Sequence, residues 1–254
     1  MTECELAVVM PVYNEEECVV AVIRSWQGVL QRLAVCYRIM VLNDGSRDRT
    51  GEELQVFQGD ETIDVVHKAN SGHGPTILLG YRRAVEIAPW VFQCDSDDEM
   101  KAEHFPRLWT ERHKYDALFG SRAGRVQSLD RKILSFGSRL AVRLMFGGGV
   151  ADVNTAYRLM RSGPLRQIVA QMPDGVFAPN VIISGAFSRA GLRLSNIPVP
   201  FEPRQSGLVS VPQGWKLAKT ASKCLWQTLC CRPVIQVDRD APTRGAENTV
   251  GSGD

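Results

Sequence analysis

The sequence predicts an α/β fold with a mostly parallel central sheet and helices on its faces. Short apolar runs alternate along the chain with segments whose apolar residues recur at helical spacing, the pattern of parallel strands joined by helices. Most of the early apolar runs are followed directly by polar residues. Because ligands of such sheets bind beyond the carboxyl ends of the strands, we expect these polar residues to lie along one edge of one cleft.

The apolar runs predict five strands, since a short apolar run bounded by polar residues is typical of a buried strand. The expected strands cover residues 6–10, 37–42, 63–66, 90–94 and 117–119. Helices are expected from residue 14 to about 33 and over residues 50–57, 76–87 and 105–113. Asn14 is the expected N-cap of the first helix with Glu17 as its capping-box partner, and Pro75 stands near the start of the third.

The composition is that of an ordinary globular protein. The 254 residues are 44% hydrophobic and 23% charged, and the formal net charge of +2 gives no sign of a nucleic-acid partner. No apolar run approaches the roughly 20 residues that span a bilayer, and the acidic first five residues are not a signal-peptide pattern. The seven cysteines show no zinc-type spacing. We therefore expect a cytoplasmic protein.

An acidic cluster after the fourth strand is the main candidate site. Residues 95–99 read Asp-Ser-Asp-Asp-Glu. Asp95 and Asp97 are two residues apart, so their carboxylates converge only where the strand gives way to a turn. Converging hard oxygens suit Mg²⁺ or Mn²⁺, ions that in enzymes usually also hold substrate phosphates. The alternative is a solvated acidic turn.

The turn after the first strand argues against two other kinds of nucleotide site. Residues 11–15 read Pro-Val-Tyr-Asn-Glu, without a glycine. A dinucleotide-binding Rossmann domain needs a glycine-rich turn at this place, and a P-loop is also missing. We therefore expect a metal to neutralise substrate phosphates, which favours the metal interpretation of the acidic cluster.

Five segments, taken in order, resemble the inverting family-two glycosyltransferases of GT-A fold. They most resemble the branch that moves a sugar onto a polyprenyl or dolichyl phosphate, over about residues 5–225. The segments are residues 11–15, 43–46, 70–74, 95–97 and 120–122. The resemblance implies one GT-A domain over residues 1–232, with a nucleotide-binding part to about 122 and an acceptor-binding part from 123. The polar, glycine-containing composition of the chain end predicts a disordered tail over residues 233–254.

The resemblance implies a nucleotide-diphosphate sugar donor, with UDP or GDP, and a metal. The expected nucleotide-binding residues are Pro11, Tyr13, Asn14, Glu15, Asn43, Asp44, Lys68, Asp95 and Ser96. Asn43 replaces the usual Asp, and because an amide offers a donor as well as an acceptor, the base preference stays open. The metal motif matches Asp95 and Asp97. Glu99 stands at the position of a third ligand, with a solvated carboxylate as the alternative.

The second half resembles the family's acceptor-binding part. Residues 152–158 resemble its Asp-x-x-x-Gly-Phe-Arg segment, and Arg204 falls in a segment like its Arg-x-x-Gly. Arg122 and Arg204 are expected to add positive charge to phosphates. A lipid phosphate acceptor is already ionised, whereas a hydroxyl acceptor needs a general base, for which Asp152 is the candidate.

Two stretches are candidates for the membrane surface. An apolar stripe over residues 133–144 has basic neighbours, and residues 215–231 combine two Trp, three Lys and adjacent Cys230 and Cys231. The alternative for both is a helix packed on the domain. We expect a membrane-peripheral protein on the inner face, or one bound to a partner that spans the membrane. A transferase to a saccharide or other hydroxyl acceptor and a non-catalytic sugar-nucleotide-binding module are the alternative functions.

Overall fold

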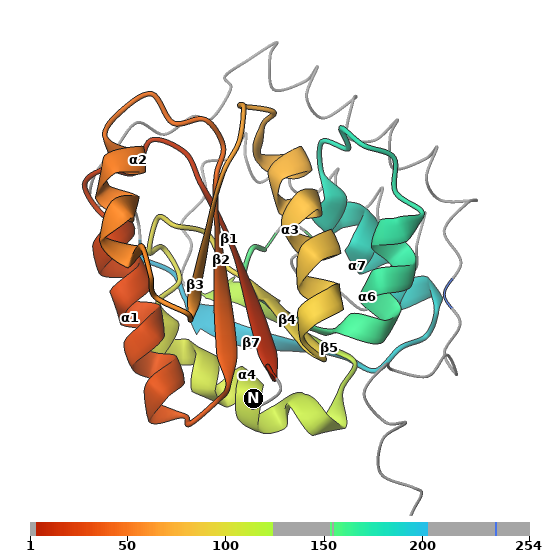
Figure 1. The fold of residues 1–254 in the computed structure, drawn as a ribbon. Coiled ribbons are helices and arrows are strands. Elements are labelled where there is room, and N and C mark those ends of the chain that lie inside the picture. Colours follow the sequence, from red (N-terminus) through yellow and green to blue (C-terminus); the bar gives the residue numbers. More distant parts are fainter. Residues whose placement is uncertain (1–3, 124–152, 154, 203–236, 238–254) are drawn as a thin grey trace, which may run out of the picture.

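The computed structural model describes residues 4–123, 153, 155–202 and 237 (Figure 1). These residues are built around a central sheet. Its strands are β1 (Leu6–Val12), β2 (Tyr37–Asn43), β3 (Ile63–His67), β4 (Trp90–Gln93), β5 (Ala117–Ala123), β6 (Arg158–Arg161) and β7 (Leu194–Pro200). Its α-helices are α1 (Val19–Arg32), α2 (Thr50–Glu53), α3 (His73–Ile87), α4 (Phe105–Glu111), α6 (Ser162–Ala170) and α7 (Pro179–Arg189). Short 3₁₀ helices are η1 (Leu54–Phe57), η2 (Ala102–His104) and η3 (Arg112–Lys114).

The strands of the described residues form one seven-stranded sheet in the order β3-β2-β1-β4-β6-β5-β7. β6 runs antiparallel to β4 and β5, and the other neighbouring pairs of this sheet are parallel. The predicted mostly parallel sheet is therefore confirmed. Val12 pairs with Asn43, and Asn43 with His67, so β1, β2 and β3 end together at one edge.

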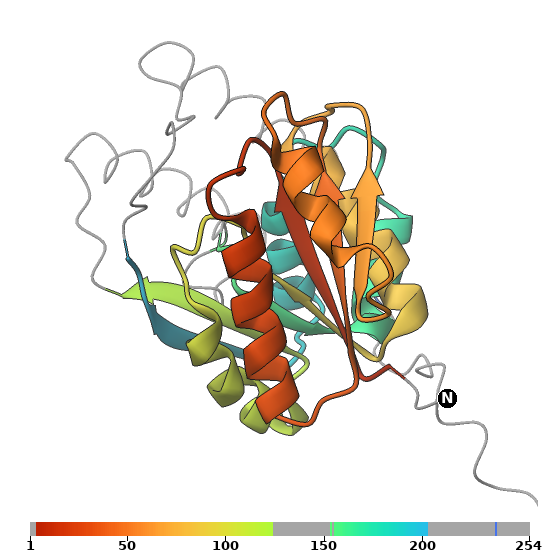
Figure 2. The same cartoon turned by 60° about the vertical axis from the view of Figure 1, so that its left-hand side comes forward.

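Helices cover both faces of this sheet (Figures 1 and 2). α1, α2 and α4 lie over one face, and α3, α6 and α7 lie over the other. All of β1 is buried, as expected for a strand covered on both faces. On the α1 face, the ring of Phe92 lies 5.1 Å from Trp26 and 4.8 Å from both Phe105 and Tyr157, centroid to centroid. This aromatic cluster joins β4 to α1, α4 and the segment before β6.

A glycine lets α3 lie close against the sheet. A β-carbon on Gly80 would stand 2.4 Å from Val9 Cγ1 and 2.6 Å from Leu42 Cδ1, well inside van der Waals contact. Any larger residue would therefore push α3 away from β1 and β2. With glycine at this position α3 packs close to the sheet, and its first turn reaches the carboxyl edge of the strands.

The structure moves the start of two predicted helices. α1 begins at Val19, and Asn14 does not cap it; Asn14 instead adopts a left-handed φ of 55°. The capping-box prediction for Asn14 and Glu17 is therefore wrong. α3 begins at His73 rather than residue 76, with Pro75 inside its first turn, where the missing amide of proline costs no helical hydrogen bond. The predicted helix over 50–57 divides into α2 and η1.

Several predicted features lie outside the described residues. They are Asp152, Arg204, the stripe over residues 133–144, the stretch over residues 215–231 and, except for residue 237, the tail from residue 233. Among the helices that the structure does describe, none combines the length and the apolar composition needed to cross a membrane.

Candidate functional site

A cavity of about 710 Å³ opens at the carboxyl edge of the sheet. Its wall is built from the segments that follow β1, β2, β3 and β4, the arrangement expected for a parallel sheet. The predicted residues that line it are Pro11, Tyr13, Asn14, Glu15, Asp44, Asp95, Ser96 and Asp97. Glu99 and Arg122 line a second cavity of about 40 Å³ that shares Asp95 and Asp97 with the first. Asn43 and Lys68 line neither of these two cavities.

The loops after β1 and β2 are hydrogen-bonded to each other, and this explains why α1 starts late. The amide of Asn14 donates to Ser46 Oγ at 3.0 Å, and Asn14 Oδ1 accepts from the amide of Arg47 at 2.8 Å. The amide of Glu15 donates to Thr50 Oγ1 at 2.8 Å. The side chain of Asn14 is therefore engaged with the neighbouring loop and is not available to cap a helix.

Asp48 supports the same pair of loops, and sequence analysis did not single it out. Its carboxylate accepts hydrogen bonds from the hydroxyl and amide of Thr50 and, at 3.2 Å, from the amide of Glu16. Burial alone would raise the pKa of Asp48, but these hydrogen bonds hold it below its ordinary value. Asp48 also lines the large cavity, so it is an anion on the cavity wall.

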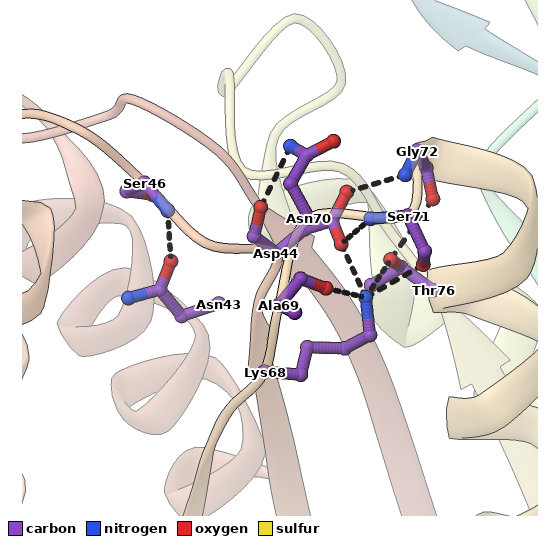
Figure 3. A network of polar contacts seen from close by, with 9 residues as sticks. All are labelled: Asn43, Asp44, Ser46, Lys68, Ala69, Asn70, Ser71, Gly72 and Thr76. Atoms are coloured by element: carbon purple, nitrogen blue, oxygen red, sulfur yellow. Dashed lines mark hydrogen bonds and ion pairs between the residues drawn. The ribbon is translucent and has the colours of Figure 1, made fainter.

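The side chain of Asp44 is the centre of a polar network, shown in Figure 3. Asp44 is buried, and its carboxylate accepts from Lys68 Nζ and from the amides of Ser71 and Gly72, both at 2.9 Å. Burial alone would raise the pKa of Asp44, but Lys68 and the amide of Ser71 hold it below its ordinary value. The network fastens the loop between β3 and α3 to the end of β2.

The ammonium group of Lys68 is used inside the protein. Besides Asp44 it contacts the carbonyl of Ala69 at 2.8 Å, Ser71 Oγ at 2.7 Å and Thr76 Oγ1 at 3.2 Å. An ammonium group has three donors, so these partners take up its whole capacity. Lys68 therefore organises the loop that carries the cavity wall.

Asn43 also faces the protein interior. Its Oδ1 accepts from the amide of Ser46 at 3.0 Å, and its Nδ2 lies 3.1 Å from His67 Nδ1. Gly45 follows with a φ of 65°, and a β-carbon there would lie 2.7 Å from the amide nitrogen of Asn70. The turn after β2 therefore requires glycine, and Asn43 holds that turn in shape.

The acidic cluster forms a turn, as its spacing requires. β4 ends at Gln93, Asp98 adopts a left-handed φ of 56°, and Asp97 Oδ1 accepts from the amide of Glu99 at 3.2 Å. Asp95 and Asp97 share the cavity wall. The described residues contain no group of three His, Cys, Asp or Glu side chains arranged to hold a metal, so Asp95, Asp97 and Glu99 are not a preformed triad. Two carboxylates on one wall still fit Mg²⁺ or Mn²⁺, which often bind one or two carboxylates plus substrate phosphates.

His73 is a cavity residue that sequence analysis missed. It stands in the first turn of α3, and its Nε2 lies 3.9 Å from Asp95 Oδ1. The next residue, Gly74, has no room for a side chain, since a β-carbon would lie 2.1 Å from the carbonyl oxygen of Phe177. The signal was present in the sequence, because His73 stands between two glycines in the family-like segment over residues 70–74, but that segment was placed outside the helix expected over residues 76–87.

The arginine of the predicted acceptor segment is fully buried. The guanidinium of Arg158 donates to the carbonyl oxygens of Val153 at 3.1 Å, Thr155 at 2.9 Å and Asn180 at 3.1 Å. These bonds fasten the segment before β6 to α7. Arg158 therefore shapes the region that follows Asp152 and does not line either cavity.

An α/β/α sheet with paired carboxylates at its carboxyl edge is the arrangement of the GT-A glycosyltransferases. The family model described as glycosyl transferase family 2 matches residues 7–169. The chain belongs to glycosyl transferase family 2, and the predicted family is confirmed.

Curated relatives carry names of sugar transferases that act on undecaprenyl phosphate. The chain is 28% identical over 193 residues to undecaprenyl-phosphate 4-deoxy-4-formamido-L-arabinose transferase of Pectobacterium atrosepticum, covering 74% of this chain and 58% of that protein. The Pseudomonas aeruginosa protein of the same name is 30% identical over 189 residues, covering 72% and 54%. Undecaprenyl-phosphate mannosyltransferase of Micrococcus luteus is 26% identical over 208 residues, covering 78% and 84%. The chain spans little more than half the length of the first two relatives.

Solved structures share the fold. Glucosyl-3-phosphoglycerate synthase from Mycobacterium tuberculosis in complex with UDP superimposes with a TM-score of 0.65 at 16% identity, covering 91% of this chain and 81% of that one. The same enzyme with Mn²⁺, UDP and glucosyl-3-phosphoglycerate gives a TM-score of 0.63 at 15% identity, with the same coverage. The predicted GT-A fold is therefore confirmed.

Proposed function

We propose that this protein is an inverting, metal-dependent glycosyltransferase that moves a sugar, predicted to be a hexose, from a UDP- or GDP-sugar to a polyprenyl phosphate. The observation that carries the proposal is that Asp95 and Asp97 line the same cavity as Asn14, Glu15 and Asp44. The names of the undecaprenyl-phosphate sugar transferases support the acceptor.

The donor is assigned to the large cavity. Its volume lies in the range of roughly 300–1,000 Å³ typical of small-molecule sites. The base and ribose are assigned to Pro11, Tyr13, Glu15 and Asp44, and the diphosphate to the end near Asp95 and Ser96. Asn43 and Lys68 act in this proposal by holding the loops, because their polar groups are bonded within the protein.

Asp95 and Asp97 would hold Mg²⁺ or Mn²⁺, with Glu99 as a candidate third ligand. When bound, such an ion supplies positive charge that stabilises the leaving diphosphate. Arg122 lines the small cavity beside both aspartates and adds a fixed positive charge there. The solved complex of a structural relative with Mn²⁺ and UDP supports the use of a divalent ion.

The acceptor is assigned to the second half of the chain. A polyprenyl phosphate carries an ionised oxygen, which attacks the anomeric carbon of the sugar without first losing a proton. In this reaction Arg204 would pair with phosphate oxygens, and Asp152 would serve as a general base only for a hydroxyl acceptor. Because the polyprenyl chain lies in the membrane, the proposal includes peripheral attachment to its inner face or to a membrane-spanning partner.

A nucleotide-sugar panel tests the proposal. Purified protein is incubated with UDP- and GDP-sugars, with Mn²⁺ or with EDTA, and with or without undecaprenyl phosphate in detergent. The expected result is formation of a lipid-linked sugar that requires both Mn²⁺ and the lipid. Sugar transfer to a water-soluble saccharide in place of the lipid would select the hydroxyl-acceptor alternative, and nucleotide binding without any transfer would select the non-catalytic module.

A further inference from the structure

A buried polar network lies behind the acidic cluster. It joins Tyr81 of α3, Gln93 at the end of β4 and Asn180 of α7, all three buried. None of these side chains lines either cavity. Buried polar groups at such a junction are costly unless their hydrogen bonds are satisfied, and here they are satisfied by one another.

The amide of Gln93 has a defined orientation. Its Oε1 accepts from Asn180 Nδ2 at 2.9 Å, and the hydroxyl oxygen of Tyr81 lies 3.1 Å from the same atom. Its Nε2 donates to Asp95 Oδ1 at 3.2 Å. An ionised carboxylate only accepts hydrogen bonds, so reversing the amide would set two oxygens against each other. Burial raises the pKa of Tyr81, which keeps its hydroxyl protonated.

The contacts of Asp95 fall on one of its two carboxylate oxygens. Within the described part of the chain, Oδ1 faces both Gln93 Nε2 and His73 Nε2, whereas Oδ2 has no such partner. The side chain is 38% exposed on the cavity wall. Asp95 Oδ1 is therefore held by the hydrogen bond from Gln93, while Asp95 Oδ2 is left for a ligand.

We propose that Gln93 is a positioning residue, which Asn180 and Tyr81 hold in place so that Asp95 presents Oδ2 to the divalent cation and diphosphate. This inference rests on the proposed function. Partners of a metal ligand that do not themselves touch the metal commonly orient that ligand and tune its affinity. The backbone oxygen of Asn180 accepts from buried Arg158, so the network is anchored in β6 as well.

Two variants separate positioning from general stability. Gln93→Met keeps the length of the side chain and removes its amide. Asn180→Asp keeps the shape of the side chain but replaces the donor to Gln93 Oε1 with an acceptor, which favours the reversed Gln93 amide. The control is Ser162→Ala, which removes a buried hydroxyl that donates to the carbonyl of Ala88, at the opposite end of β4 from the cavity.

The measurement is the affinity for UDP by calorimetry, with Mn²⁺ and with EDTA, for wild type and each variant. We expect Gln93→Met and Asn180→Asp each to reduce the enhancement of UDP affinity by Mn²⁺ about 10- to 100-fold, with little change in EDTA. Ser162→Ala should leave that enhancement unchanged. In the Gln93→Met background, Asn180→Asp should add nothing further, because its effect acts through Gln93.

Each other outcome has a definite meaning. If Mn²⁺ enhances UDP affinity equally in wild type and in the two folded variants, the positioning role is wrong, while the proposed function stands. Equal losses with Mn²⁺ and with EDTA would make the network a support of the fold alone and overturn the inference. If the wild-type protein binds neither UDP nor GDP, with or without Mn²⁺, the proposed function and the inference are both wrong.

Discussion

The ammonium group of Lys68 donates to the buried carboxylate of Asp44, and this ion pair ties the end of β3 to the end of β2. Both side chains are largely shielded from water, with 18% and 5% of their surface exposed. Removing one partner of such a pair leaves the other charge buried without compensation, which costs far more than breaking an exposed pair. The pair is therefore a structural support of the cavity.

Lys68→Met should lower the free energy of unfolding at neutral pH by about 3 kcal/mol, the lower end of the effect of breaking a buried ion pair. Chemical denaturation gives this value directly. The control is Glu86→Gln, which breaks an exposed pair with Arg166 and should cost no more than about 1 kcal/mol. Equal costs for the two variants would contradict the structural role of Lys68.

Stability should fall when the pH is lowered toward the acid range. The pKa values of Asp44 and Asp48 are held below their ordinary values in the folded protein. A carboxyl group with a depressed folded pKa stabilises the protein above its unfolded pKa of about 3.9, and this contribution disappears as the pH falls through the folded pKa. Unfolding measured from pH 7 downward should show the loss below about pH 4.

The same series can be run on Lys68→Met. Without Lys68 the pKa of Asp44 rises, and protonated Asp44 no longer needs a cation, so the destabilisation of this variant relative to wild type should shrink as the pH falls through the acid range. A difference that stays constant over the whole pH range would show that Lys68 acts by packing rather than by its charge.

Asp97→Asn should abolish the enhancement of nucleoside diphosphate affinity by Mn²⁺ and leave the fold intact. An amide carries no charge, so it is a poor ligand for a hard divalent cation. Calorimetry with UDP or GDP measures the enhancement. Asp98→Asn is the matched control, because Asp98 lines neither cavity and asparagine also tolerates its left-handed φ of 56°. Retained enhancement in the Asp97 variant would exclude Asp97 as a ligand.

Thr50→Val should weaken nucleotide binding both with Mn²⁺ and without it. The variant removes the hydroxyl that accepts from the Glu15 amide and donates to Asp48, and it loosens the two loops that line the cavity. The expected loss is about 1 kcal/mol, roughly fivefold in affinity. Thr62→Val is its control, because the Thr62 hydroxyl likewise donates to an aspartate, Asp60, and accepts from Gln27 Nε2, but neither of these partners lines the cavity. An equal loss of affinity in both variants would contradict the role of Thr50.

Attachment to membranes is expected from residues 215–231. Each Lys near an anionic surface contributes roughly 1 kcal/mol, so Lys216, Lys219 and Lys223 together give weak, salt-sensitive binding. Flotation with liposomes containing anionic lipids should recover the protein at low salt. Recovery should fall in high salt and in a variant with all three lysines replaced by alanine. A protein that stays with the soluble fraction at low salt would favour a water-soluble acceptor.

The sequence predicted the first half of the fold because its signals there are local. Continuous apolar runs such as residues 6–10 are typical of strands buried on both faces, and the polar residues after them meet at one edge by topology alone. The same reasoning brought Asp95 and Asp97 to the wall where the structure places them.

Local signals were insufficient where distant segments compete for a side chain. Asn14 looked like a helix cap, but its carbonyl oxygen Oδ1 is taken by the amide of Arg47 in another loop. Lys68 and Asn43 stand at strand ends as ligand-binding residues do, yet Lys68 pairs with Asp44 after β2 and the amide of Asn43 lies against His67 of β3. Nor does any pattern near Gln93 reveal a partner on α7, since Asn180 is distant in sequence.

The four-residue strand β6 has a consequence for the synthesis of the protein. β5 and β7 join the sheet only through β6, which pairs with β4 on one side and β5 on the other. Until residues 158–161 leave the ribosome, β4 therefore lacks the strand that covers its outer edge in the described sheet. An uncovered strand edge is a template for pairing with another chain. A nascent chain that ends before β6 can therefore pair through the open edge of β4 with another chain.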